Sequence, residues 1–320
     1  MSFKSVISAA ALAVSLGVAA GSANASMVLT AAGTAENFTL STFASGFPTT
    51  GFCCGPLGIA FPNSGGVLVT DYPGNVRLFA TDADGQLASS APVGQFYGNS
   101  NAVGLAKAGG NIYMTQQGNQ DLVRISDTGT FISTVATGLG FATGIAANPT
   151  NGHLYVSNVG GTIWDINPGV SVTALITGIN ADGLSTDGTT LYGAANGHIL
   201  GYNIATHAQV FDSGNVGDVD GTALGTGVLA GKIYGNTNSG NVIEVDLASL
   251  AVTTIASGGS RGDFVTVDPN GSLLLTQTDS IVRLTPPSGG GFVGQTPEPA
   301  SIALLGLGLA GLGFTRRRKR

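Results

Sequence analysis

The sequence predicts an all-β fold in which six similar blades form a closed ring. A short pattern centred on glycine recurs six times, at intervals of about forty residues. Each copy is followed by further short runs of β-forming residues separated by turn residues. Gly accounts for 51 of the 320 residues, and this suits many tight turns because Gly adopts positive φ at little steric cost. Together these observations predict a six-bladed β-propeller.

The repeated pattern marks the innermost strand of each blade. It begins at Pro56-Leu-Gly-Ile-Ala-Phe, and five further copies follow along the chain. The anchor positions of the copies are Gly58, Gly104, Gly144, Gly183, Gly221 and, in a degenerate sixth copy, Asp263. Second strands are expected at 67–70, 112–115, 154–157, 191–194, 233–236 and 273–276, and third strands about ten residues later. A fourth strand follows in copies one to five, as at Phe131 to Ala136, which completes a propeller blade.

The sixth copy has no fourth strand of its own, because it stops at Pro286-Pro287. The segment Thr39 to Gly46 is similar to Phe131 to Gly138, a fourth strand followed by Gly. We therefore expect the first strand of the chain to complete the last blade, which would leave no blade edge unpaired. The alternative, a β-sandwich followed by a second domain, does not explain six copies and one displaced strand.

The N-terminal residues 1–25 have the pattern of a secretory signal peptide. Lys4 provides a positive start, Val6 to Ala20 is apolar, and Ala23-Asn24-Ala25 is a small-x-small cleavage site. We expect a mature chain that begins at Ser26, with the propeller over residues 26–286. The alternative is an uncleaved membrane anchor.

The C-terminal residues combine three features in a fixed order. A Gly-rich linker at 287–296 leads to Pro297-Glu298-Pro299, and an uncharged stretch follows from Ala300 to Phe314. The chain ends with five basic residues, which are Arg316, Arg317, Arg318, Lys319 and Arg320. The uncharged stretch is close to the roughly 20 residues of a spanning helix. The basic end favours a cytoplasmic C-terminus, so we expect an inner-membrane precursor with the body in the periplasm.

This tail, residues 297–320, resembles the PEP-CTERM sorting signal of Gram-negative bacteria. The resemblance implies recognition and cleavage near Pro297-Glu298-Pro299 by a membrane-embedded protease of the exosortase type. It also implies delivery to the cell surface or an exopolysaccharide matrix, with exopolysaccharide or surface proteins as partners. The alternative is a plain tail anchor without processing.

The first copy resembles the NHL-type repeat, and the body from about 38 to 286 is similar to six-bladed propellers of the gluconolactonase and strictosidine-synthase-like group. Fold does not imply function, so the resemblance leaves the activity open. The formal net charge of −6 includes the basic tail, so the body is more acidic still. Such a body repels nucleic acid and anionic lipid, and nucleic acid is not expected as a partner.

The residue before each anchor is expected at the opening of the central channel. Two of these residues are carboxylates from adjacent blades, Asp182 and Asp220, and carboxylate oxygens suit a divalent cation such as calcium. Lactonases of the similar group hold a divalent metal with a Glu, an Asn and an Asp. Asp182 matches that Asp, whereas Thr143 stands in the place of the Asn and no Glu lies near the first anchor. Capping of loops is the alternative role for the two aspartates.

Cys53 and Cys54 are the two cysteines of the chain, and they are adjacent. After export they could form a vicinal disulfide, form an intermolecular bridge or remain free thiols. Gly51, Gly55 and Pro56 favour a turn at this point, so a structural or redox-sensitive turn is preferred over a catalytic pair.

The histidines and a short Asp-rich segment do not indicate a catalytic site. His153, His198 and His207 show no spacing with Ser and Asp that indicates a triad, and Asp82-Ala-Asp84-Gly is interpreted as a tight turn. The leading hypothesis is therefore an exported, non-enzymatic binding or structural propeller. The alternatives are a divalent-metal hydrolase of the gluconolactonase type and a redox or quinone-dependent role for Cys53-Cys54.

Overall fold

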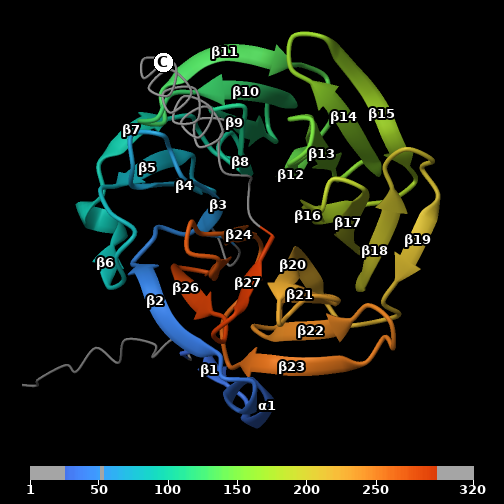
Figure 1. The fold of residues 1–320 in the computed structure, drawn as a ribbon. Coiled ribbons are helices and arrows are strands. Elements are labelled where there is room, and N and C mark those ends of the chain that lie inside the picture. The colour runs from blue at the N-terminus through green and yellow to red at the C-terminus, as the bar shows by residue number, and fades with distance from the viewer. Residues whose placement is uncertain (1–25, 51–53, 294–320) are drawn as a thin grey trace, which may run out of the picture.

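The computed structural model describes residues 26–50 and 54–293. Six sheets, antiparallel except for one short parallel pair, stand around a central axis like the blades of a propeller, and the innermost strand of each sheet lies nearest that axis (Figure 1). The described residues contain one short α-helix and one short 3-10 helix. The predicted six-bladed β-propeller is confirmed.

The blades follow one another along the chain, and their strands run from the axis outward. Blade one contains β3 (Pro56–Ala60), β4 (Val67–Asp71), β5 (Asn75–Phe79) and β7 (Val93–Phe96). Blade two contains β8 (Leu105–Ala108), β9 (Asn111–Gln116), β10 (Asp121–Ile125) and β11 (Phe131–Ala136). Blade three contains β12 (Ala142–Ala147), β13 (Leu154–Asn158), β14 (Thr162–Asn167) and β15 (Ser171–Thr177).

Blade four contains β16 (Ala181–Thr186), β17 (Thr190–Ala195), β18 (His198–Asn203) and β19 (Gln209–Asp212). Blade five contains β20 (Val219–Gly227), β21 (Lys232–Thr237), β22 (Val242–Asp246) and β23 (Val252–Ser257). Blade six contains β24 (Val265–Val267), β25 (Leu273–Thr276), β26 (Ser280–Thr285) and, from the start of the chain, β2 (Thr39–Ser45).

The N-terminal segment closes the ring and pairs with strands of both blade five and blade six. β2 pairs antiparallel with β26, from Thr39 opposite Thr285 to Ser45 opposite Ser280, as predicted. Ahead of it, β1 (Val28–Leu29) pairs with β23 of blade five. The helix α1 (Ala31–Ala35) links the two, and its N-cap Thr30 accepts a hydrogen bond from the Gly33 N–H at 3.2 Å. The segment therefore spans the joint between blades five and six.

A long loop of blade one forms a second connection between neighbouring blades, here between blades six and one. It carries β6 (Gln86–Leu87), which pairs in parallel with β2, and the 3-10 helix η1 (Ala88–Ser90). At the start of this loop, Asp82 and Asp84 accept bonds from the Arg283 guanidinium at 2.7 and 2.9 Å. Arg283 also pairs with Asp268 and is 7% exposed. The interpretation of Asp82-Ala-Asp84-Gly as no more than a local turn is therefore incomplete.

The glycine anchors are explained by the crowding of neighbouring inner strands. A Cβ built on Gly144 would lie 1.9 Å from the Asp182 carbonyl oxygen, and one on Gly183 would lie 2.3 Å from that of Asp220. No L side chain fits such a contact without moving backbone. Glycine at this position therefore lets adjacent blades meet at the axis.

Side-chain hydroxyls connect blades one to four across the same contact. In blades one, two and three, a hydroxyl on the second strand accepts a bond from the anchor N–H of its own blade and donates to a carbonyl of the next blade. These hydroxyls belong to Thr70, Thr115 and Ser157. Thr115 Oγ1, for example, accepts from Gly104 N and donates to Thr143 O, both at 2.8 Å. Each hydroxyl is hydrogen-bonded to two buried backbone groups, and in blade one the Gly58 N–H also donates directly to the Val103 carbonyl at 2.9 Å.

The last described strand belongs to the segment predicted as a linker. β27 (Gly290–Phe292) pairs with the end of β20, and Val293 N–H donates to the Leu224 carbonyl at 2.8 Å. Among the described residues, no helix is long and apolar enough to span a membrane. The predicted signal peptide (1–25) and sorting tail (297–320) lie outside the described residues.

Candidate functional site at the channel mouth

Three aspartates from adjacent blades meet where the inner strands of blades four, five and six begin. Asp182 lies in β16 and Asp220 in β20, as the sequence predicted for the channel opening. Asp263 precedes β24, and Arg261 lies two residues before it. We call these four residues the acidic mouth.

Asp263 occupies the place in blade six that Asp182 and Asp220 occupy in blades four and five. A Cβ on Gly221 would meet the Asp263 carbonyl, just as one on Gly183 meets that of Asp220. The next residue, Phe264, donates its N–H to Thr276 Oγ1 at 2.8 Å, the bond that the anchor N–H makes in blades one to three. The prediction that Asp263 is the anchor and Gly262 the channel residue is therefore wrong by one position. Blade six has Phe264 instead of glycine at the anchor position, so the repeated pattern does not identify Asp263 as the third channel carboxylate.

Arg261 binds two of the three carboxylates. Its Nη2 lies 2.6 Å from Asp263 Oδ1 and 3.4 Å from Asp220 Oδ2, and its Nε donates to Asp263 Oδ1 at 2.9 Å. The side chains of Asp220 and Asp263 are 11% and 7% exposed, whereas that of Arg261 is 36% exposed. Asp182 is half-buried. Arg261 and Asp182 are therefore partly exposed, whereas Asp220 and Asp263 are buried.

Burial and mutual repulsion favour protonated carboxyls here. Burial, followed by the charges of Asp182 and Asp263, raises the pKa of Asp220 to about 8. Burial and the charge of Asp263 raise the pKa of Asp182 to about 6. Burial also raises the pKa of Asp263, although the hydrogen bond from Arg261 opposes this shift. One guanidinium does not balance three carboxylates, so the mouth retains protons near neutral pH.

Two buried acceptors in the mouth have no hydrogen-bond donor. They are Asp263 Oδ2 and Asn238 Oδ1, and the Asn238 side chain contacts the Asp220 carboxyl. A buried polar atom without a partner costs about 1–3 kcal/mol. The protons that the carboxyls retain supply donors within the mouth, since Asp220 is hydrogen-bonded to both Asp182 and Asp263.

The other side of the mouth is apolar. Leu57 and Val103, at the equivalent positions of blades one and two, pack in one buried cluster with Cys54 and Phe264. Thr143 of blade three accepts a bond from Gln117 Nε2 at 3.3 Å and donates to the Phe141 carbonyl at 3.0 Å. Cys54 is 5% exposed, and the adjacent Cys53, a candidate for a vicinal disulfide, lies outside the described residues.

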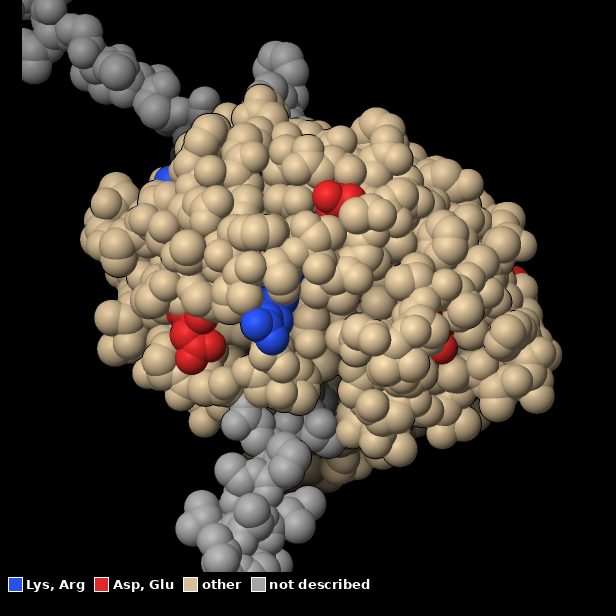
Figure 2. All heavy atoms as spheres, turned by 90° about the horizontal axis from the view of Figure 1, so that it is seen from above, with Lys and Arg blue, Asp and Glu red and all other residues tan. Residues whose placement is uncertain are grey.

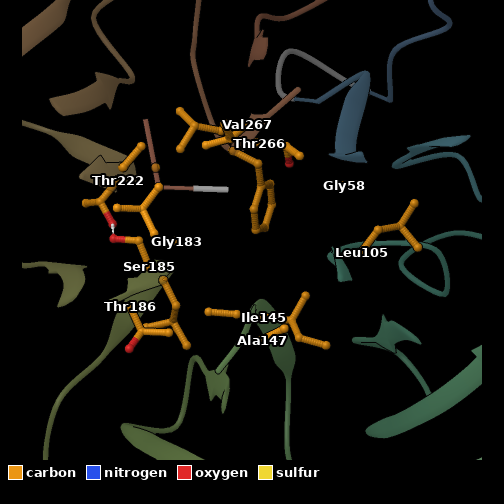
Figure 3. Close-up of a pocket in the computed structure, with 17 residues that line it drawn as sticks. Gly58, Leu105, Ile145, Ala147, Gly183, Ser185, Thr186, Thr222, Thr266 and Val267 are labelled. Carbon is orange, nitrogen blue, oxygen red and sulfur yellow. Dashed lines mark hydrogen bonds between the residues drawn. The ribbon is translucent and has the colours of Figure 1, made fainter. Parts of the chain in front are cut away.

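A pocket lies farther along the axis, beyond the inner-strand anchors (Figure 3). Its walls are mostly apolar and include Leu105, Ile145 and Val267. The hydroxyls of Ser185 and Thr222 face one another there and are hydrogen-bonded at 2.9 Å. Val293 also lines this pocket, so the chain leaves the propeller close to its axis. The ionisable groups are therefore at the mouth rather than in this pocket.

A divalent-metal site at Asp182 and Asp220 is one of the predictions from the sequence. Within residues 26–50 and 54–293, no three His, Cys, Asp or Glu side chains are grouped so that they could hold a metal ion. The histidines His153 and His198 instead pair with Asp165 and Asp212, each at 2.7 Å, away from the mouth. On the face shown in Figure 2, charged side chains are few and scattered, so the acidic mouth is an unusual concentration of charge.

Comparison with known structures supports the fold. A gluconolactonase from Xanthomonas campestris is 14% identical with a TM-score of 0.62, and the alignment covers 81% of this chain and 94% of that one. A putative oxidoreductase (glucose dehydrogenase) from Thermus thermophilus is 18% identical, with a TM-score of 0.57 and coverage of 78% and 100%. An auxiliary nutrient binding protein from Bacteroides thetaiotaomicron is 13% identical, with a TM-score of 0.57 and coverage of 78% and 76%. At these identities the likeness concerns the fold alone.

No curated protein matches the sequence. The model of the PEP-CTERM protein-sorting motif matches residues 295–319, which include Pro297-Glu298-Pro299 and all but the last residue of the basic end. The chain is therefore a six-bladed β-propeller of the kind shared by gluconolactonase-like proteins, and it carries a PEP-CTERM protein-sorting motif at its C-terminal end.

Proposed function

We propose that the protein is an exported propeller that is sorted by an exosortase-type membrane protease and acts at the cell surface or in an extracellular matrix as a binding module. The observation that carries this proposal is the sorting motif at 295–319, two residues after the last described residue. In this account Ala300 to Phe314 holds the precursor in the inner membrane, and the five basic residues keep the C-terminus in the cytoplasm. The propeller would then lie in the periplasm until the tail is removed.

Binding is favoured over catalysis by the composition of the acidic mouth. It combines carboxylates, a guanidinium and an apolar wall, which can hold a polar ligand in one orientation. Of the Glu, Asn and Asp ligands of similar lactonases, only the Asp has a counterpart here, which is Asp182. Thr143 stands in the place of the Asn, and its hydroxyl is hydrogen-bonded to Gln117 and Phe141. A binding role therefore uses more of the site than the hydrolase role does.

The sorting part of the proposal is tested by fractionation of the native bacterium with an antibody to the propeller. Glu298→Ala removes the charged residue of the tripeptide and leaves the apolar stretch intact. We expect the wild-type protein to be shorter and to reach the surface, and the variant to stay longer and in the membrane. Glu36→Ala is a control, because it removes a partly buried carboxylate of the propeller, which pairs with Lys232, and keeps the tail. Equal size and location of wild type and Glu298→Ala would show that the tail is only an anchor.

The hydrolase of the gluconolactonase type remains a second candidate, favoured by the position of Asp182 at the channel mouth. A divalent cation such as calcium would be its cofactor. The test is metal content: tight, stoichiometric calcium that is lost in the Asp182→Asn, Asp220→Asn double variant would support the hydrolase over the binding module.

A further inference from the structure

The chain leaves the propeller at the end of β20 that lies away from the acidic mouth. Asp220 is the second residue of β20, whereas β27 pairs with Gly225 to Gly227 at the other end of that strand. The Val293 N–H donates to the Leu224 carbonyl, so the segment that leads to the sorting motif continues directly from β27. The position of β27 therefore sets where the tail begins.

The strand β27 lies at a sheet edge and carries one large side chain. Gly290 and Gly291 contribute only backbone, whereas Phe292 is buried in the core cluster between blades five and six. A short edge strand gains little stability from its backbone bonds alone. The burial of Phe292 is therefore the main apolar contact that keeps β27 in place.

Phe292 packs on Tyr234 of β21, and Tyr234 also contacts the N-terminal segment. The ring centroids of Tyr234 and Phe292 lie 4.9 Å apart with planes at 87°, and those of Tyr234 and Phe38 lie 5.9 Å apart with planes at 69°. Both contacts are edge-to-face, a favourable arrangement for aromatic rings. The Tyr234 hydroxyl donates to Glu244 Oε2 at 2.5 Å, which fixes the far end of the ring. One tyrosine therefore links the first and the last segments of the propeller.

The ring of Phe38 depends on closure of the propeller by the N-terminal segment. Phe38 lies between α1 and β2, and it is buried together with Met27 in the same core cluster as Tyr234 and Phe292. Displacement of this segment would leave a cavity beside Tyr234. A closely packed core responds to such a cavity by partial collapse, which moves the neighbouring rings. Movement of Tyr234 would reach Phe292 directly.

We propose that the ring-closing N-terminal segment also holds β27 in place, through the contacts of Phe38 and Phe292 with Tyr234. When the N-terminal segment is displaced, β27 is released before the rest of the propeller unfolds. Release frees residues 287–293 and lengthens the connection to the tail by up to about 25 Å, at ~3.6 Å per residue. For the membrane-held precursor, a consequence that rests on the proposed function, only a closed propeller would keep its exit end close to the membrane.

The test is limited digestion with chymotrypsin, which cleaves after Phe292 only when β27 is released. The full chain in detergent is digested under native conditions, and the ends of the fragments are identified by mass spectrometry. When opening and closing are fast, the cleavage rate reports the population of the open form. We expect Phe38→Ala to increase the rate of cleavage after Phe292 by about tenfold or more, because truncation of a buried Phe is strongly destabilising.

Leu154→Ala is the matched control, because Leu154 is also fully buried but belongs to the core cluster between blades two and three. It should lower the melting temperature of the propeller and leave cleavage after Phe292 close to the wild-type rate. Glu36→Ala is a control within the N-terminal segment, since its ion pair with Lys232 is partly exposed and contributes little. It should also leave this cleavage close to the wild-type rate.

The converse variant keeps the test decisive if Phe38→Ala does not fold. Coupling between two contacts is reciprocal, so Phe292→Ala should increase the rate of cleavage after the buried Phe38 by a similar factor. Equal acceleration by Phe38→Ala and Leu154→Ala, or no acceleration in either direction, overturns the inference. Digestion of the purified chain does not depend on export, so these results are distinct from a failure of the proposed sorting in the fractionation experiment.

Discussion

At the residue scale, the acidic mouth makes stability depend on pH in a defined direction. The folded-state pKa values of Asp182 and Asp220 are raised, to about 6 and about 8, above the ordinary value of 3.8. The folded protein therefore binds more protons than the unfolded chain between about pH 4 and pH 8, and the free energy of unfolding falls as pH rises through this window. We expect a melting temperature that is higher at pH 5 than at pH 8.5. Asp220→Asn should reduce this difference and raise stability at pH 8.5 by more than about 1.4 kcal/mol, one unit of pKa. A melting temperature that rises between pH 5 and pH 8.5 would contradict the claim that Asp182 and Asp220 retain protons in the folded protein.

The hydroxyl bridges between blades give a second residue-scale prediction. Thr115→Val keeps the shape of the side chain but leaves the Gly104 N–H and the Thr143 carbonyl unpaired in a buried place. We expect the free energy of unfolding to fall by about 1–3 kcal/mol, measured by denaturant titration. Thr130→Val, at an exposed turn position, should change it by less than about 0.5 kcal/mol. Similar effects of the two substitutions would mean that the bridge adds no net stability.

At the scale of elements, the ring depends on the N-terminal segment. Deleting Ser26 to Ser45 removes β1 and β2, which uncovers the edges of β23 and β26 and leaves β6 without its partner. Unpaired strand edges associate with one another. We expect a lower melting temperature and aggregation, visible in size-exclusion chromatography with light scattering. A truncated propeller that melts at the wild-type temperature and stays monomeric would refute closure by β2.

Some of these elements were predictable from the sequence, and others were not. β2 was found because Thr39 to Gly46 is similar to an intact fourth strand, and Asp182 and Asp220 because each precedes a repeated glycine. Asp263 was misplaced because blade six has Phe264 at the anchor position. β1 and β6 pair with strands that are distant in the sequence, and the local pattern of a two-residue strand does not indicate such a partner. The repeated Thr or Ser at the end of the second strand was visible in the sequence, but its role depends on a carbonyl of the next blade.

At the scale of the whole molecule, propeller and tail are connected in a way that suits display. The chain leaves at the axis beside Val293, and the sorting motif begins at residue 295. Six residues separate Val293 from the uncharged stretch at Ala300, and the seven Cα–Cα steps reach about 25 Å when extended. The precursor would therefore hold the exit end of the propeller close to the membrane and the acidic mouth away from it.

The central claim, export followed by removal of the tail, is tested most directly by intact mass spectrometry of the propeller recovered from the surface of the native bacterium. The account predicts a chain that begins at Ser26, because Ala23-Asn24-Ala25 is the expected cleavage site and β1 starts soon after it. It also predicts the loss of the last ~20 residues, an extent set by the length of a membrane span. A surface protein whose mass corresponds to the complete chain from Met1 to Arg320 would contradict the account.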